Sequence, residues 1–176
     1  FRQSNTILLD GGMGTMLQAA GLKLGACPEE LNITDPALIE GIHGQYAAAG
    51  SRIVNANTFG ASAHKLAGST YTLEQVITAG IENCKRACAP YGALTALDVG
   101  PLGELLEPSG TLAFEDAVAE YARIVKAGEA AGADLIFFET YTDLYELKAA
   151  LLAAKENTHL PILASMSFEA GGRTFT

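Results

Sequence analysis

The sequence has little of what marks secreted, membrane-spanning or nucleic-acid-binding proteins. Its three cysteines, an odd and low number without a secretory signal, argue against a disulfide framework. Its longest apolar run, around Leu135 to Phe138, is far shorter than the ~20 residues that cross a bilayer. We therefore expect a cytoplasmic protein that makes no contact with a membrane.

Positive charge is also scarce. The 176 residues include 11 lysines and arginines against 20 aspartates and glutamates, giving a formal net charge of −9. A chain of this charge repels phosphate backbones, so we expect no nucleic-acid partner. With 49 % apolar and 18 % charged residues, the chain suits one domain with a hydrophobic core, which we predict to span residues 1–176.

The cysteines and histidines do not form an obvious ligand set. Cys84 and Cys88 are four residues apart, so on a helix they share a face. They are either half of a metal site or two small apolar residues on a buried face, and we favour the second because no nearby ligand completes a set. We assign no role to Cys27, and we expect the scattered histidines to be structural or exposed: His43, His64 and His159.

Strand and helix patterns alternate along the chain. Apolar segments predict strands at 6–10, 52–59, 93–99, 133–140 and 161–168. Helices are predicted between them. Their start signals are Asp35 before Pro36, Thr72 with Gln75, a start at Thr111, and Thr142 or Asp143. Strands separated by helices predict a parallel sheet covered by helices, which is an α/β fold.

Polar residues cluster at the carboxyl end of every predicted strand. They are Asp10; Asn55, Asn57 and Thr58; Asp98; Glu139 and Thr140; Ser165 and Ser167. In a barrel these ends converge on one mouth, whereas in an open doubly wound sheet only those at the switch point meet a ligand. Periodicity alone leaves both architectures open. The polar ends favour a (β/α)8 TIM barrel, here reaching from the first strand to about the fifth.

A glycine-rich loop follows the first predicted strand. Gly11, Gly12 and Gly14 allow backbone conformations closed to other residues and bring N–H groups close to a ligand. Near a helix start, such N–H groups bind anions. The loop has neither the spacing of a dinucleotide fingerprint nor a phosphate-loop lysine, so a small carboxylate is favoured over a phosphate. A tight turn without a ligand is the alternative.

Two acids are predicted to share the mouth with this loop. Glu139 ends an apolar strand, and burying its carboxylate alone is costly. With Asp10 it could perform acid–base chemistry or hold an ammonium group. The adjacent anion site favours the second, which describes a pocket for an α-amino acid; a salt bridge to Lys or Arg is the alternative for Glu139. Asn55 and Asn57, on one side of the second strand, would bind a ligand or brace the acids.

Five motifs carry a family resemblance. They occur in order at 10–15 (DGGMGT), 28–32 (PEELN), 57–61 (NTFGA), 100–104 (GPLGE) and 138–140 (FET). From about Ile7 to Thr174 the chain resembles the homocysteine-binding domain of cobalamin-dependent methionine synthases, which is related to betaine- and S-methylmethionine-homocysteine methyltransferases. Ala56 stands where that family commonly has threonine.

The resemblance implies a (β/α)8 barrel and a defined substrate site. In it Asp10 and Glu139 hold the ammonium group of homocysteine, and the backbone at Gly12, Met13 and Gly14 receives its carboxylate. Asn57 is a further candidate contact. The family binds zinc through three cysteines, one after the sixth strand and two after the eighth. This sequence reaches only just past the fifth, so we expect the ligands outside it and the chain inactive alone.

The implied reaction is methyl transfer to homocysteine. Zinc would deprotonate the homocysteine sulfur, which attacks a methyl group on cobalamin, and methyltetrahydrofolate would recharge the cobalamin on another module. The alternatives are a betaine or S-methylmethionine donor, a non-catalytic amino-acid-binding or assembly module, and an unrelated acid–base barrel enzyme using Asp10 and Glu139. The open strand edges of an incomplete barrel also predict self-association.

Overall fold

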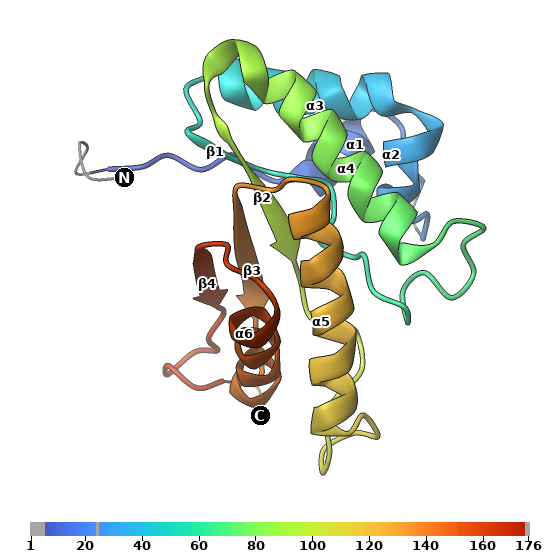
Figure 1. Ribbon diagram of the computed structural model, residues 1–176, viewed down its shortest axis with the longest axis vertical. Helices are drawn as coiled ribbons and strands as arrows, with labels where there is room; N and C mark the ends of the chain where they lie inside the picture. Colours follow the sequence, from blue (N-terminus) through green and yellow to red (C-terminus); the bar gives the residue numbers. More distant parts are fainter. Residues whose placement is uncertain (1–5, 24, 175–176) are drawn as a thin grey trace.

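Four parallel strands form the centre of the computed structural model, which describes residues 6–23 and 25–174. In order across the sheet they are β1 (Ile53–Asn55), β2 (Leu94–Val99), β3 (Leu135–Tyr141) and β4 (Ile162–Met166) (Figure 1). Each is hydrogen-bonded to its neighbour in sequence order, as in a barrel, with no reversal of strand order.

The first predicted strand is present only as a bridged segment. Leu9 pairs in parallel with Ile53, and the Asp10 N–H donates to the Ile53 carbonyl at 3.1 Å. The prediction of a strand at 6–10 is therefore corrected to an extended segment at the outer edge of β1. The second strand was also predicted too long, because it ends at Asn55 and the chain turns after Ala56, whose N–H still donates to the Ala96 carbonyl of β2 at 3.0 Å.

Four long helices connect the strands: α3 (Pro36–Ala48), α4 (Leu73–Cys88), α5 (Phe114–Ala130) and α6 (Leu144–Asn157). The predicted caps are present. Asp35 accepts from the Leu38 N–H, Thr72 and Gln75 form a reciprocal capping box, and Asp143 rather than Thr142 caps α6. Helix α5 begins at Phe114 and not at the predicted Thr111, because Leu112 forms a β-bridge with Leu106.

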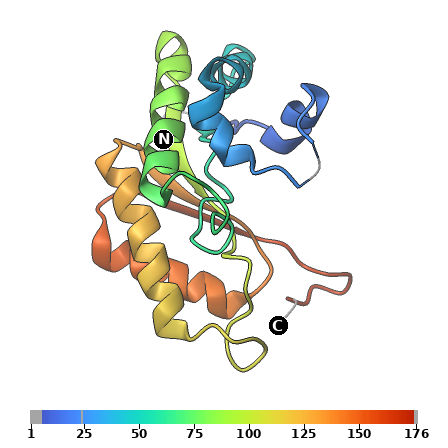
Figure 2. The same ribbon diagram turned by 90° about the vertical axis from the view of Figure 1, so that its right-hand side faces the viewer.

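Shorter helices lie around the amino-terminal half. They are α1 (Met13–Ala19), α2 (Leu31–Thr34) and the 3-10 turns η1 (Pro28–Glu30) and η2 (Ala89–Tyr91). Figure 2, turned by 90°, shows α1, α2 and α3 grouped apart from α5 and α6. None of the described helices is long and apolar enough to cross a membrane.

The two faces of the sheet differ in what covers them. Side chains that alternate along the strands pack against α4, α5 and α6 in the main core, among them Val54, Leu97, Val99, Ile136 and Phe138. The opposite face carries a small cluster of Ile53, Ala96, Leu135 and Phe137. Helices outside and a strand-only face inside are what a (β/α)8 barrel requires.

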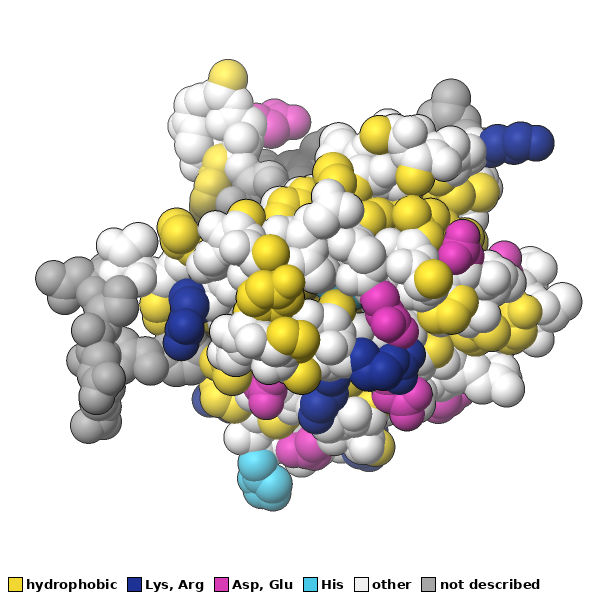
Figure 3. All heavy atoms as spheres, turned by 90° about the horizontal axis from the view of Figure 1, so that it is seen from above, with side chains coloured by type: hydrophobic (Ala, Val, Ile, Leu, Met, Phe, Trp, Pro, Cys, Tyr) yellow, Lys and Arg dark blue, Asp and Glu magenta, His cyan; other side chains and the backbone are white. Residues whose placement is uncertain are grey.

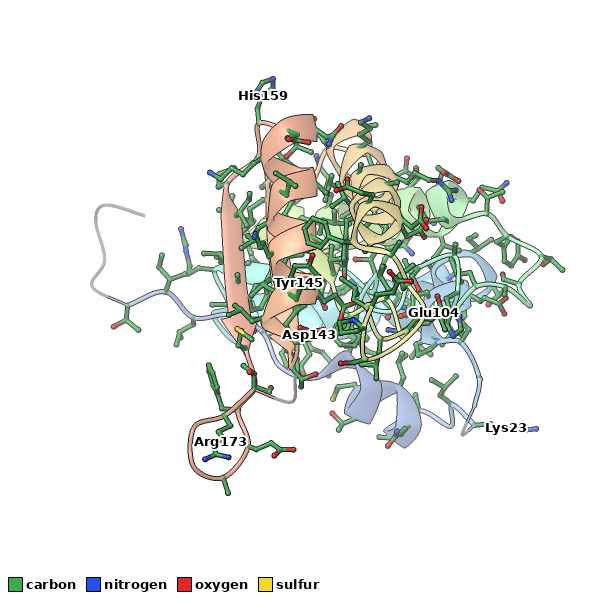
Figure 4. All side chains as sticks on the ribbon, turned by 90° about the horizontal axis from the view of Figure 1, so that it is seen from below. Lys23, Glu104, Asp143, Tyr145, His159 and Arg173 are labelled. Atoms are coloured by element: carbon green, nitrogen blue, oxygen red, sulfur yellow. The ribbon has the colours of Figure 1, made fainter. Side chains whose placement is uncertain are left out.

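The two ends of the sheet can be viewed separately. In Figure 3, the view from above, lysine and arginine side chains lie beside aspartates and glutamates and form no separate basic patch on this face. The strand arrows of Figure 1 point downward, so the view from below in Figure 4 faces the carboxyl ends of the strands. Asp143 and Tyr145 lie there at the start of α6. In barrels the active site lies at this carboxyl end.

Candidate functional site

A cavity of about 160 Å³ lies where the strands end. Its lining comes from the loop before α1 and the ends of β1, β2 and β3: Asp10, Gly11, Gly12, Met13, Asn55, Ala56, Asn57, Phe59, Asp98 and Glu139. The structure thus brings together five of the six predicted residues, and the sixth, Gly14, directly follows Met13 in α1. A larger hollow of about 600 Å³ near Tyr145 is also lined by two acids, Glu107 and Asp143, but there a lysine, Lys148, lines the hollow with them.

Asp10 is held by its neighbour strand but is not neutralised. Its Oδ2 accepts a hydrogen bond of 3.0 Å from the Asn55 N–H, whereas Oδ1 is buried without a partner among the described residues. Burial is the main cause that raises the pKa of Asp10 from 3.8 to about 7, with a further contribution from Glu139. A buried carboxyl group with a raised pKa and one unpartnered oxygen is stabilised by protonation or by a bound cation.

Glu139 is aimed into the cavity by an irregularity in β3. The pairing of β3 with β4 shifts between Phe138 and Tyr141, and Thr140 takes a φ of 61°, which is rare for a β-branched residue. The Thr140 N–H donates to Ser165 Oγ at 3.0 Å, which holds this conformation. Such bulges re-aim side chains beside active sites. Burial raises the pKa of Glu139, and a hydrogen bond from Asp98 opposes the rise.

The cavity has no basic residue to balance its acids. In the part of the chain that the structure describes, the ion pairs join other residues, and none includes Asp10, Asp98 or Glu139. The alternative of a salt bridge for Glu139 is therefore not what the structure shows. Asp98 was predicted only as a polar strand end, although a lone acid in the mainly apolar strand 94–99 is a usable signal of a site residue.

The glycine loop has a different physical basis from the one predicted. Gly11, Gly12 and Gly14 are not among the residues with positive φ, so they are not needed for a left-handed backbone. Gly11 is instead required by close approach, because a Cβ there would lie 2.9 Å from the hydroxyl of Tyr46. Gly12 precedes α1 without a side-chain cap, and the first N–H groups of a helix have no acceptor within it. Gly12 and Met13, at this helix start, line the cavity.

Asn57 lines the cavity together with Asn55, but its side-chain amide is bonded to a neighbouring segment. It lies beyond the end of β1, so strand alternation no longer sets its direction. Its Nδ2 donates to the Pro28 carbonyl at 2.8 Å and to Asn32 Oδ1 at 2.9 Å. Asn55 Oδ1, in contrast, is buried without a partner among the described residues. The Asn57 side chain thus braces the segment of Pro28 and Asn32 and not the acids, and its contact with a ligand stays a prediction.

Two buried glutamates, which the sequence analysis did not assign, hold the loops around the site. Glu29 accepts from the Gly60 N–H at 2.6 Å and from the Cys27 thiol at 3.1 Å, so Cys27 is not incidental. Glu146 accepts from the Leu102 N–H at 2.8 Å and from the Tyr121 hydroxyl at 2.9 Å. Apart from Cys27, the partners of these acids are 25 or more residues away in sequence, which is why no local pattern signalled them.

The described residues do not fit a zinc site. They contain no group of three or more His, Cys, Asp or Glu side chains placed to hold a metal ion. Cys84 and Cys88 are free and buried in α4 with their sulfurs 3.8 Å apart, which confirms the prediction of a buried apolar face. His43 is fully buried, whereas His64 contacts Glu104 at 3.3 Å on the surface.

Comparison with known proteins places these features in a family. The model of the homocysteine S-methyltransferase family matches residues 7–176. The methionine synthases of Mycobacterium tuberculosis (strain ATCC 25618 / H37Rv) and Mycobacterium leprae (strain TN) are each 32 % identical over 93 % of this chain. The chain spans only 15 % of the length of either relative.

Solved structures give the same fold. The metallated form of the homocysteine methyltransferase MmuM from Escherichia coli matches with a TM-score of 0.84 at 23 % identity, over 95 % of this chain and 65 % of that one. Its oxidized form matches with a TM-score of 0.77 at 25 % identity, over 94 % and 63 %. The parallel sheet described above is thus of the same TIM-barrel type.

Proposed function

Since this chain belongs to the homocysteine S-methyltransferase family, we propose that its cavity binds L-homocysteine as the acceptor of a methyl group. The observation that carries the proposal is the group of unbalanced carboxylates beside an open helix start. An α-amino acid brings both missing partners, an ammonium group for the acids and a carboxylate for the N–H groups.

The binding mode follows from this complementarity. Asp10 and Glu139 contact the ammonium group, and the N–H groups of Gly12, Met13 and Gly14 receive the carboxylate. Entry of a cation lowers the electrostatic cost of ionising Asp10, whose pKa of about 7 reflects its burial in an acidic cavity. The side chain of the ligand then points toward the mouth, where a methyl donor can approach.

Activation of the sulfur requires groups beyond those described. A thiol becomes a good nucleophile as its thiolate, and the described residues contain no metal site that would produce one. We therefore propose that residues other than those described here would hold the zinc ion. The residues of this chain bind and orient the amino-acid part of the substrate, and we predict that the 176 residues alone form no methionine.

The proposed donor is methylcobalamin on another module, recharged from methyltetrahydrofolate. The 32 % identity with two methionine synthases supports this choice over a betaine or S-methylmethionine donor. Methyl transfer assayed with each donor separately decides between them. A cytoplasmic location, one domain over 1–176 and self-association through open edges stay predictions.

A second function is favoured by the raised pKa values themselves. An acid–base enzyme using Asp10 and Glu139 would also need carboxyls that hold a proton near neutral pH. It differs from the first in predicting no affinity for homocysteine. Affinity for the amino acid therefore separates the two.

The test is a calorimetric titration of L-homocysteine, with zinc present, into this chain and into a version that continues through the eighth strand. We expect binding by the extended version, weakened at least about tenfold by Asp10→Asn and by Glu139→Gln, since each removes one charged hydrogen bond. Glu156→Gln, an exposed acid of α6, serves as the matched control. Absence of binding by both chains would overturn the assignment.

A further inference from the structure

Asp98 is the most deeply buried of the three cavity acids. Its side chain is 6 % exposed, it lines the cavity, and its Oδ1 has no hydrogen-bond partner among the described residues. A buried carboxylate oxygen without a partner costs free energy unless something else satisfies it. The position therefore calls for a ligand or a proton.

The backbone of Asp98 is fixed independently of its carboxyl group. The Asp98 N–H donates to Thr58 Oγ1 at 3.2 Å, and the Thr58 hydroxyl donates to the Asp98 carbonyl at 2.8 Å. Strand pairing of Asp98 with Phe137 adds a second constraint. The side chain is thus presented to the cavity by contacts that a substitution at its carboxyl group leaves intact.

The ionisable groups that act on Asp98 are almost all acids. Glu139 of β3 and Asp10 of the loop before α1 act most strongly, followed by Glu29 of η1, and the Tyr141 hydroxyl also senses its charge. Burial and these acids raise the pKa of Asp98 well above its usual value. Asp98 and Glu139 line the same cavity, and Asp98 Oδ1 has no hydrogen-bond partner among the described residues, so a proton held between the two acids would satisfy it.

We propose that Asp98 is a third ammonium-binding carboxylate of this site and shares one proton with Glu139 until a cationic ligand enters. The proposal rests on the proposed function, because it assumes an α-amino acid in the same cavity. When the ammonium group binds, the shared proton leaves to solvent and both carboxylates accept from the ligand. Two carboxylates that line one cavity without a basic residue favour sharing a proton until a cation is present.

The proposal makes binding depend on pH in a defined way. At a pH below that at which the Asp98–Glu139 pair loses its shared proton, the ligand must displace this proton to bind. At higher pH both carboxyl groups are already ionised. The affinity for an amino acid therefore rises with pH, by up to about tenfold per unit for each proton released. Without Asp98, no proton is shared with Glu139 and this part of the pH dependence disappears.

The test titrates L-methionine into the complete protein at pH 6 and pH 8. L-methionine has no thiol, so a released proton cannot come from sulfur. Calorimetry in two buffers of different ionisation enthalpy counts the protons released. We expect Asp98→Asn to release about one proton fewer, with an affinity that rises about tenfold less between the two pH values. Asp116→Asn, an exposed acid in the first turn of α5, is the matched control.

The outcomes separate this inference from the proposed function. Binding by all variants with equal proton release overturns the role of Asp98 and leaves the amino-acid pocket standing. No binding of L-methionine or L-homocysteine by the unmodified protein overturns both. Asp98→Ser, which removes the carboxyl group with less bulk, repeats the test, and thermal melting of each variant shows whether it is folded.

Discussion

Replacement of Asp10 by asparagine should make the ligand-free chain more stable while it weakens binding. The Asp10 carboxylate is ionised at high pH in a cavity where no basic residue balances it, among those the structure describes. Asparagine keeps an oxygen that can accept from the Asn55 N–H, as Asp10 Oδ2 does at 3.0 Å. The variant thus loses the charge and keeps the bond.

The magnitude follows from linkage. The pKa of Asp10 is 3.8 in its usual state and about 7 in the folded chain. Between these values the folded state binds more protons than the unfolded one, so the free energy of unfolding falls as pH rises. At about 1.4 kcal/mol per pKa unit the full cost is about 4 kcal/mol. Solvent reaches part of the side chain, so we expect about 2 kcal/mol between pH 5 and pH 8.

Urea unfolding of both proteins at pH 5, 6, 7 and 8 measures this difference. We expect the stability gained by Asp10→Asn to grow across the series and to level off above pH 7. Asp116→Asn should show a change of less than about 0.5 kcal/mol with pH. An advantage that stays constant with pH, or a variant that is less stable at pH 8, would refute the electrostatic account of this cavity.

Three further predictions concern the fold around the site. His43 is buried with neither ring nitrogen hydrogen-bonded among the described residues and its pKa is lowered to about 4, so unfolded chains bind more protons between pH 4 and 6.5. Acidification across that window should cost about 3 kcal/mol, and His43→Leu should remove the loss in melts at pH 5 and 7. Gly128→Ala should destabilise by about 1–3 kcal/mol in urea because its Cβ would meet a leucine of β2 at 2.4 Å, whereas Gly44→Ala, with nothing within 4 Å, should stabilise. Glu146→Ala leaves the Leu102 N–H and the Tyr121 hydroxyl unpaired and should lower the free energy of unfolding by about 2–4 kcal/mol, whereas Tyr121→Phe should lower it by about 1 kcal/mol. Equal losses would contradict the role of Glu146 in holding both groups.

Much of the architecture could be predicted because its signals are local. The Thr72 capping box, the Asp35 cap and the apolar runs of β2, β3 and β4 each depend on a few consecutive residues. Convergence of the strand ends also followed from the parallel topology, which is why Asp10 and Glu139 lie in one cavity.

What was missed depends on contacts between distant segments. The Asn57 amide donates to Asn32 and Pro28, whose acceptors lie 25 and 29 residues earlier in the chain. Gly11 is explained by the Tyr46 ring and not by its own φ. The depth at which Asp98 is buried depends on the packing of three strands, which no local pattern contains.

The most direct test of the central claim is a crystal structure of the complete protein with L-homocysteine bound. We expect the ammonium nitrogen within about 3.2 Å of carboxylate oxygens of Asp10 and Glu139, and the ligand carboxylate on the N–H groups of Gly12 to Gly14. An amino acid bound elsewhere, or in this cavity with its ammonium group turned away from the carboxylates, would contradict it.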